Sequence, residues 1–378
     1  MVFEHDLPEA AVERYSRQII VPGIRVEGQK CLGNSGVLVV GCGGLGCPAI
    51  MYLVSCGIGR LGLVDFDKVE IHNLQRQVMY TEADVSQYKV AAALSFARRA
   101  NSSIEIVGYN EFLSEENVER IISPYDVILD CTDSIHTRYL LSDYCKALSK
   151  NLICGSVLRW EGQLYKLTPS GPCYRCLFPE MKERTLTCED AGVVGPICGV
   201  IGSLQALEAI RVITGDTRPK MVIYSGIGSD LVDSQLRGPK PDCSVCSKKL
   251  IHKNLSFPAR RCVSTSNTEI DPDVATVDWK DILGNLESCL LIDIRSPIQY
   301  EMFRIKGSIN IPLESLLENT GKIEAVGKKV GVVCKKGISS KKGVLILKAN
   351  GVDAFSVNGG IDGLKSYLRK TEKSHISE

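Results

Sequence analysis

The sequence predicts an α/β protein with a large, mostly parallel sheet and a second, smaller α/β domain. Between Gly36 and about Val157, short apolar stretches that favour strands alternate with longer stretches that favour helices. Apolar strands alternating with helices are typical of a parallel sheet covered on both faces. A second alternation of the same kind begins near residue 274. These two regions indicate two α/β domains of unequal size.

The predicted elements of the larger domain follow from this alternation. Strands are expected at 36–41, 61–65, 104–108, 126–130 and 152–157, and helices at 44–57, 85–100, 114–123 and 136–149. Residues 185–195 are expected to form a loop, and 199–214 a helix.

A polar segment separates the two alternating regions. It is basic at first, then rich in Ser and Thr, and it contains Pro258 and Pro272, which is typical of a linker. We therefore expect domains at 1–250 and 274–372, joined by a linker at 251–273. In the smaller domain, strands are expected at 289–294, 331–334 and 354–357.

Composition excludes several classes of function. The net charge of +1 gives no electrostatic reason to expect direct nucleic-acid or membrane binding. The N-terminal residues do not resemble a signal peptide, and no apolar run reaches the roughly 20 residues that span a bilayer. A cytoplasmic protein is expected. In such a protein, 16 cysteines indicate metal binding or thiol chemistry rather than disulfides.

A glycine loop follows the first predicted strand. Gly41, Gly43 and Gly46 fit the G-x-G-x-x-G pattern between a strand and a helix, and Gly44 lies within it. Glycines let the backbone approach phosphates, and the helix N-terminus favours negative charge. Asp65, at the end of the second predicted strand, has the position of a carboxylate that binds ribose hydroxyls. This Rossmann-like pattern alone is explained equally well by a NAD-dependent oxidoreductase.

The residues after Asp65 distinguish a site for ATP from a site for NAD. Asn73, Arg76 and Lys89 have no evident use near the phosphates of NAD, whereas cleavage of ATP needs cations beside the leaving pyrophosphate. Asp133 follows a predicted strand at its carboxyl end, where it could bind Mg²⁺. Arg76 or Lys89 alone would be better explained as a solvated surface charge. Their order favours Mg-ATP.

These motifs resemble a known family. The segments GCGGLG, VDFD with NLQRQ, QYK, DCTD and RYSRQ resemble the adenylation domain of enzymes that activate ubiquitin-like proteins. The resemblance is to the branch acting on molybdopterin- and thiamin-type sulfur carriers, and it covers about residues 11–250. It implies that Asp65 binds ribose, that Asn73, Arg76 and Lys89 contact phosphates, and that Asp133 binds magnesium. It also implies that Arg17 reaches the ATP site of the other subunit of a homodimer. Ser134 departs from the family, which usually has Asn there.

Two Cys-x-x-Cys pairs predict a zinc site. Together the four thiolates can complete a tetrahedral structural site, with no position left for water. A thioredoxin-like redox role for either pair is the alternative. One zinc explains both pairs, and the resembling family has such a site at matching places. The predicted ligands are Cys173, Cys176, Cys243 and Cys246.

Cys188 is a candidate nucleophile. A lone loop cysteine is usually inert, but Cys188 has polar neighbours in the segment that the resembling family uses as a crossover loop over the adenylate. The resemblance implies a thioester or disulfide-linked intermediate at this thiol.

Cys334 is the second candidate nucleophile. By itself, its loop is better explained as a strand-end cysteine beside solvated lysines. The segments 290–312 and 358–364, however, resemble a rhodanese domain over about 274–372, in which Cys334 has the position of the persulfide cysteine. Asp293 and Arg295 match the structural D-x-R motif of that domain. Ile338-Ser339 replaces the usual Asn-Asp, which affects the donor pocket.

Together the two halves resemble the eukaryotic adenylyltransferase and sulfurtransferase that serves molybdopterin synthase and tRNA thiolation. This resemblance implies ATP, Mg²⁺ and one structural Zn²⁺ per chain. It implies a ubiquitin-like carrier ending in Gly-Gly as substrate, and a cysteine desulfurase or another sulfur donor. The alternative is a conjugation enzyme with a non-catalytic rhodanese-like docking domain, in which case Cys334→Ala would leave thiocarboxylate formation intact.

Overall fold

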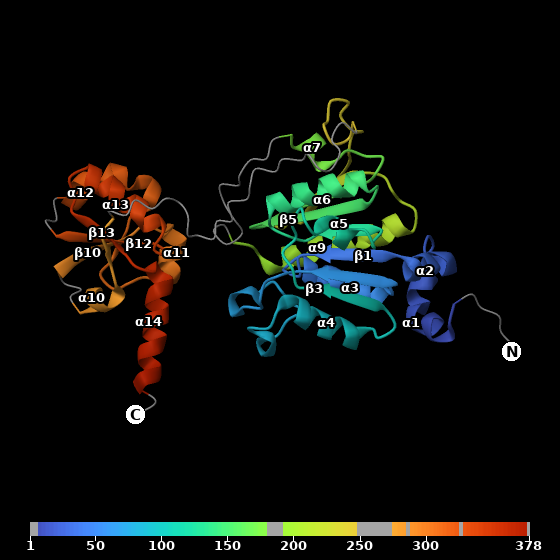
Figure 1. The fold of residues 1–378 in the computed structure, drawn as a ribbon, viewed down its shortest axis with the longest axis horizontal. Coiled ribbons are helices and arrows are strands. Elements are labelled where there is room, and N and C mark those ends of the chain that lie inside the picture. Colours follow the sequence, from blue (N-terminus) through green and yellow to red (C-terminus); the bar gives the residue numbers. More distant parts are fainter. Residues whose placement is uncertain (1–6, 180–191, 248–273, 285–287, 325–327, 376–378) are drawn as a thin grey trace. The chain divides into compact units, whose positions relative to one another are not determined.

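The computed structural model describes residues 7–179, 192–247, 274–284, 288–324 and 328–375. The chain divides into two compact units, Met1–Leu255 and Ser256–Glu378 (Figure 1). The predicted linker at 251–273 and the candidate nucleophile Cys188 lie outside the described residues.

The first unit is built on an eight-stranded sheet with the order β3-β2-β1-β4-β5-β6-β7-β8. The five strands that come first in the chain are parallel, as the sequence predicts, and the last three are antiparallel. The strands are β1 (Gly36–Val40), β2 (Arg60–Val64), β3 (Glu105–Tyr109), β4 (Val127–Asp130), β5 (Asn151–Leu158), β6 (Glu161–Leu167), β7 (Lys220–Ser225) and β8 (Asp230–Gln235).

Helices cover both faces of this sheet (Figure 1). Helices α3, α4 and α9 pack on one face, where α3 contacts α9, and α5 and α6 cover the other. The helices are α1 (Glu9–Ile19), α2 (Arg25–Asn34), α3 (Gly46–Cys56), α4 (Lys89–Ala100), α5 (Val118–Ile122), α6 (Ile135–Ala147), α7 (Tyr174–Leu177) and α9 (Gly195–Ile213). Their apolar faces meet β1, β2 and β4, whose residues are almost all buried.

Helix α9 begins four residues earlier than predicted, at Gly195 rather than Gly199. Within the described residues, it is the one helix long and apolar enough to cross a bilayer, contrary to the expectation that no run would qualify. Half of it is buried inside the unit, where it packs against α3, β5 and β6. Its apolar composition is thus explained by a position in the core.

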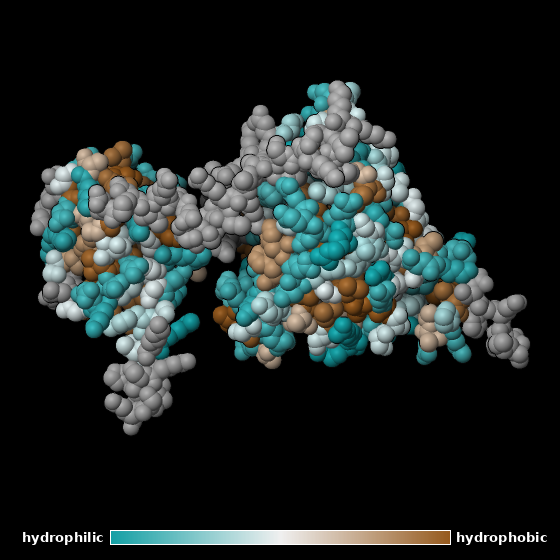
Figure 2. Space-filling model, in the orientation of Figure 1, coloured by the Kyte–Doolittle hydropathy of each residue, from teal (hydrophilic) through white to brown (hydrophobic). Residues whose placement is uncertain are grey.

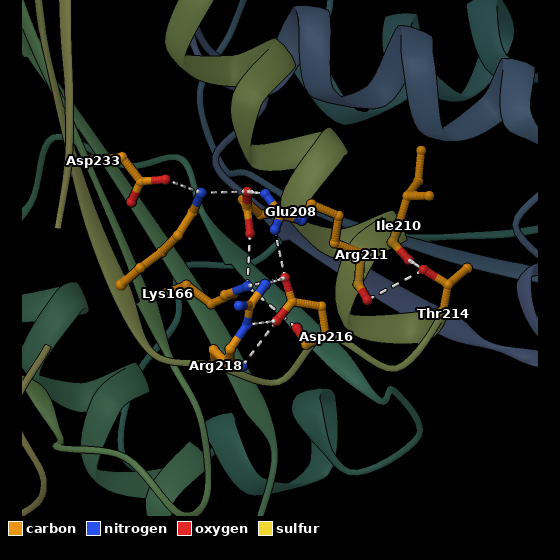
Figure 3. Close-up of polar contacts among 9 residues, drawn as sticks. Lys166, Glu208, Ile210, Arg211, Thr214, Asp216, Arg218 and Asp233 are labelled. Atoms are coloured by element: carbon orange, nitrogen blue, oxygen red, sulfur yellow. Dashed lines mark hydrogen bonds and ion pairs between the residues drawn. The ribbon is translucent and has the colours of Figure 1, made fainter. Parts of the chain in front are cut away.

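An ionic network joins the C-terminal end of α9 to the antiparallel strands (Figure 3). The fully buried Lys166 of β6 places Nζ 2.8 Å from Oε2 of Glu208 and 3.6 Å from Oδ2 of Asp216. Lys220 of β7 bridges Glu208 and Asp233 of β8, with both N–O distances at 3.0 Å. The buried lysine is therefore paired, as a buried charge must be.

The second unit contains a five-stranded parallel sheet with the order β11-β10-β12-β13-β9. Its strands are β9 (Thr276–Val277), β10 (Cys289–Asp293), β11 (Ile309–Asn310), β12 (Lys329–Val333) and β13 (Ala354–Val357). Its α-helices are α10 (Trp279–Leu283), α11 (Pro297–Met302), α12 (Thr320–Glu324), α13 (Ser339–Ala349) and α14 (Gly360–His375). The core lies on both faces of β12, where Val332 and Val333 are buried in separate apolar clusters.

The visible surface of each unit is mixed in character. Figure 2 shows hydrophilic side chains over much of both units, with apolar groups scattered between them.

Candidate functional site

The glycine loop lies where β1 and β4 end side by side. Gly41 has a φ of +94°, and a Cβ there would lie 2.8 Å from the carbonyl oxygen of Cys131, just after β4. Only glycine accommodates this conformation and this contact. The helices that follow β1 and β4 pack on opposite faces of the sheet, so this is the topological switch point, where open sheets bind ligands.

Asp65 orders the loop from the end of β2. Its Oδ2 accepts a 2.8 Å hydrogen bond from the backbone N–H of Cys42, and its Oδ1 accepts one of 2.8 Å from Asp67. Burial raises the pKa of Asp65, although nearby Lys89 opposes this shift. Each carboxylate oxygen retains a lone pair, so ribose hydroxyls can still donate to it.

Lys89 is a buried cation at the start of α4. Its Nζ lies 2.9 Å from Oδ2 of Asp67. Burial lowers the pKa of Lys89, but Asp65 and the bond to Asp67 outweigh it, so the net pKa is raised. The side chain therefore stays an ammonium, which phosphate binding requires. Asp67, its partner, was not assigned a role from the sequence.

Asn73 and Arg76 lie together beside the glycine loop. Nη2 of Arg76 donates to Oδ1 of Asn73 at 2.7 Å. A Cβ at Gly44 would lie 3.4 Å from Cγ of Arg76 and 3.1 Å from Sγ of Cys198, in the first turn of α9. The guanidinium of Arg76 therefore lies close to both the glycine loop and the start of α9.

Asp133 is exposed in the turn between β4 and α6. The next residue, Ser134, is the N-cap of α6, and its Oγ accepts a 3.2 Å bond from the backbone N–H of Thr137. Serine and asparagine are equally good N-caps. The departure at Ser134 therefore preserves the helix start that follows Asp133.

The sequence does not indicate the buried ion pair that lies behind this turn. Arg138 places Nε 2.6 Å from Oδ2 of Asp130, and its Nη2 donates to the carbonyls of Thr132 and Gly155. Oδ1 of Asp130 accepts bonds from the backbone N–H and the hydroxyl of Thr132. The pair therefore fixes the Cys131–Asp133 backbone. In the sequence, Arg138 resembles any surface residue of a helix.

Arg17 is exposed on α1, at the far end of α3 from its own glycine loop. The neighbouring Tyr15 packs against Gly57, just after α3, and Gln18 donates to the carbonyl of Cys56. Helix α3 has 11 residues, a length of about 16 Å. The structure therefore does not bring Arg17 together with the loop of the same chain.

The four predicted zinc ligands converge. Their Sγ atoms all lie within 4.8 Å of one another, with Cys173–Cys243 and Cys176–Cys246 both at 3.5 Å and Cys173–Cys176 at 3.7 Å. A tetrahedral zinc with bonds of about 2.3 Å requires sulfurs about 3.8 Å apart. The donor set and its spacing therefore fit Zn²⁺.

The segment that contains Cys188 is described only at its two ends. On the far side, the N–H of Arg159 donates to the carbonyl of Gly192 at 3.0 Å, and the N–H of Val194 donates to Arg159 at 3.1 Å. Helix α9 then begins beside Gly44. The segment thus ends next to the nucleotide loop.

Cys334 lies at the carboxyl end of β12 in the second unit. Its Sγ accepts a hydrogen bond of 3.1 Å from the backbone N–H of Gly337, which has a φ of +78°. A Cβ at Gly360 would meet the carbonyl of Cys334 and the N–H of Gly337, so the loop is closely packed. Ile338 is half-buried and Ser339 is exposed.

Asp293 and Arg295 form a buried bidentate pair at the end of β10. Their N–O distances are 2.9, 3.0 and 2.6 Å, and Arg295 also donates to the carbonyl of Phe303. These hydrogen bonds connect the end of β10 to the backbone at Phe303, in keeping with a structural role.

Comparison with known proteins identifies both units. The ThiF family matches residues 15–245, and the rhodanese-like domain matches residues 278–367. The ThiF match covers more than half of the chain, and the chain belongs to the ThiF family.

Curated relatives carry both domains' activities in their name. The adenylyltransferase and sulfurtransferase MOCS3 of Aedes aegypti is 42% identical over 343 residues, covering 85% of this chain and 78% of that protein. The Bos taurus protein of the same name is 35% identical over 397 residues, covering 97% and 87%. Among solved structures, that of E. coli MccB + ATP has a TM-score of 0.54 at 23% identity, covers 64% of this chain and 77% of that chain, and shows the shared fold.

The chain is therefore an enzyme, an adenylyltransferase and sulfurtransferase with a ThiF-type adenylation domain and a rhodanese domain. The resemblance drawn from its motifs is confirmed. ThiF-type adenylation implies ATP, which removes the NAD-dependent oxidoreductase from consideration.

Proposed function

We propose that this enzyme adenylates the C-terminal glycine of a ubiquitin-like sulfur carrier ending in Gly-Gly and then converts it to a thiocarboxylate. The product serves tRNA wobble-uridine 2-thiolation and molybdopterin synthesis in the cytoplasm. The observation that carries the proposal is the placement of Cys334 after β12, where the N–H of Gly337 donates to its sulfur at 3.1 Å. A backbone donor there can form a charge-assisted hydrogen bond to an anionic sulfur, either thiolate or persulfide.

In the first step, a carboxylate oxygen of the carrier attacks the α-phosphorus of ATP, and pyrophosphate leaves. The backbone of Gly41, Gly43, Gly44 and Gly46 approaches the phosphates. Asp65 accepts bonds from the ribose, and Asn73, Arg76 and Lys89 neutralise the departing charge. Asp133 would hold Mg²⁺, which would supply further neutralisation of that charge. Adenylation is needed because a carboxylate oxygen is a poor leaving group. Once it is bonded to the phosphate of AMP, it can leave as part of AMP.

In the second step, the terminal sulfur of a Cys334 persulfide attacks the acyl carbon and AMP leaves. The resulting acyl disulfide is cleaved when the Cys188 thiolate attacks the sulfur of Cys334. This releases the thiocarboxylate and leaves a Cys188–Cys334 disulfide, which a cellular thiol reduces. Alternatively, Cys188 first takes the acyl group from AMP as a thioester. A cysteine desulfurase or a donor such as thiosulfate recharges Cys334.

Two lengths of chain support this assignment of Cys188 and Cys334. Cys188 is four residues before Gly192, and four residues of fully extended chain span at most about 14 Å. The proposed linker of 23 residues at 251–273 spans up to about 80 Å, enough for the rhodanese domain to approach the adenylate.

The proposed assembly is a homodimer in which Arg17 completes the partner's ATP site. Its support is the position of α1 at the opposite end of α3 from the loop of the same chain. We also propose that Cys173, Cys176, Cys243 and Cys246 hold one structural Zn²⁺ per chain. With four sulfur ligands, the ion pins the segment after β8 to α7.

Carrier-dependent exchange of labelled pyrophosphate into ATP tests the adenylation step. Lys89→Ala and Asp133→Ala should each reduce exchange by about two orders of magnitude or more, because each removes charge from the transition state. Cys334→Ala should exchange at the normal rate. Normal exchange by the Lys89 and Asp133 variants would contradict the assignment.

A further inference from the structure

Beneath Cys334 lie two buried serines, Ser340 and Ser356. Ser340 is in the first turn of α13, and Ser356 is on β13, paired with Val332 of β12. Both serines have no exposed surface, and Cys334 itself is 5% exposed. The three side chains therefore meet in the interior of the second unit.

The three polar groups form a chain. Sγ of Cys334 is 3.4 Å from Oγ of Ser340, which is 2.8 Å from Oγ of Ser356. Either hydroxyl of the serine pair can be the donor. The direction of the chain therefore depends on whether Cys334 carries a proton.

Their surroundings make a packing role a poor explanation. The adjoining cluster consists of apolar side chains, including Val332, Val344, Leu347 and Ala354. A buried hydroxyl costs free energy unless it is hydrogen-bonded, whereas an alanine side chain has no polar group to bury. Two serines that bond to each other and to the reactive thiol therefore indicate a role connected with that thiol.

We propose that Ser356 is a positioning residue that acts through Ser340 on the sulfur of Cys334. With a thiol, the S–H donates to Ser340, and Ser340 donates to Ser356. When the thiol proton passes to solvent, both hydroxyls turn, so Ser356 donates to Ser340 and Ser340 donates to the sulfur anion. The sulfur anion then accepts two hydrogen bonds, one from the hydroxyl of Ser340 and one from the backbone N–H of Gly337.

The physical basis is the difference between neutral and charge-assisted hydrogen bonds. Bonds to an ionised acceptor are about twice as strong as neutral ones, and successive bonds in a chain strengthen one another. The relay therefore offers the sulfur anion charge-assisted hydrogen bonds. The same donors fit a persulfide anion, so the inference rests on Cys334 being the sulfur-transferring thiol of the proposed function.

The test measures alkylation of Cys334 by limiting iodoacetamide in the full-length protein between pH 6 and pH 10. The thiolate displaces iodide, and the Cys334 peptide is quantified by mass spectrometry, which separates it from other cysteines. Below the midpoint of the profile, Ser340→Ala should slow alkylation about ten-fold and Ser356→Ala about three-fold. Both should move the midpoint to higher pH.

The double variant distinguishes a relay from packing. If Ser356 acts through Ser340, then Ser340→Ala/Ser356→Ala should alkylate at the rate of Ser340→Ala alone. Additive effects in the double variant, or a Ser356→Ala profile identical to that of the unaltered protein, would overturn the proposal. Thermal unfolding of each variant identifies any loss of fold. If the serine variants alkylate as expected but the carrier gains no sulfur, the result would count against the proposed function and not against the relay.

Discussion

Asp130 and Arg138 form an ion pair inside the adenylation domain, with Nε 2.6 Å from Oδ2 and side-chain exposures of 0% and 3%. The pair lies directly behind the turn that presents Asp133, and it bonds to that turn through Thr132. A buried pair of this kind fixes the backbone of a site that would otherwise be an exposed turn. The ion pair therefore holds in place the turn that carries Asp133, the proposed ligand of Mg²⁺.

Replacing Arg138 by methionine should destabilise the adenylation domain by about 3–5 kcal/mol, because it leaves the Asp130 charge buried without a partner. Urea unfolding measures this change. The matched control is Arg120→Met, which removes the exposed pair with Glu111 and should cost less than about 1 kcal/mol. Equal costs for the two variants would show that Asp130 and Arg138 do not depend on each other.

Replacing Cys243 by serine should abolish stoichiometric zinc. The protein as purified should hold about one zinc per chain, since four thiolates fit one tetrahedral ion. Elemental analysis measures the content, and unfolding measures the accompanying loss of stability. Cys31→Ser, at an exposed cysteine, is the control and should keep its zinc. Full zinc content in Cys243→Ser would exclude the four-cysteine site.

Mixing two inactive variants tests whether Arg17 acts across a dimer. Arg17→Ala and Lys89→Ala should each lose adenylation activity alone. After subunit exchange at equal amounts, hybrid dimers contain one intact site, so activity should recover to about a quarter of the normal value. If Arg17 served its own chain, no intact site would form and the mixture would stay inactive.

The stability of the adenylation domain should fall at alkaline pH. Burial raises the pKa of Cys47 and of Cys56 to about 12, from an ordinary value of 9.0. Between these values the unfolded chain loses the thiol protons and the folded chain keeps them, so stability is complete below pH 9.0 and declines toward pH 12. Each thiol contributes a slope of up to about 1.4 kcal/mol per pH unit.

Urea unfolding at several alkaline pH values measures that slope. Cys56→Ala should reduce the slope, whatever its effect on stability at pH 8. An unaltered slope in Cys56→Ala would show that this thiol titrates alike in both states.

The parallel half of the large sheet could be predicted because its strands are buried on both sides. β1 and β4, for instance, are continuous apolar runs between helices. The edge strand β8 could not be predicted, because its six residues are all exposed and carry no apolar pattern. In the rhodanese domain, β9 and β11 have two residues each, which is too short for any periodicity.

Residues of the candidate site divide in the same way. Glycines and cysteines at fixed spacing stand out in the sequence, since few other roles require them. Arg138, Asp67 and Ser356 do not, because each acts through a partner brought close only by the fold. The position of Arg17 at the far end of α3 likewise follows from the packing of Tyr15 on Gly57, which no local pattern records.

The most direct test is the intact mass of a Gly-Gly-ending carrier after incubation with this enzyme, Mg-ATP, thiosulfate and a thiol reductant. The carrier should exchange one carboxylate oxygen for sulfur with the unaltered enzyme and none with Cys334→Ala. Ser315→Ala, at a serine of the same domain whose hydroxyl donates to the carbonyl of Pro312, is the control and should be active. Thiocarboxylate formation by Cys334→Ala would contradict the account and would make the rhodanese domain a docking module.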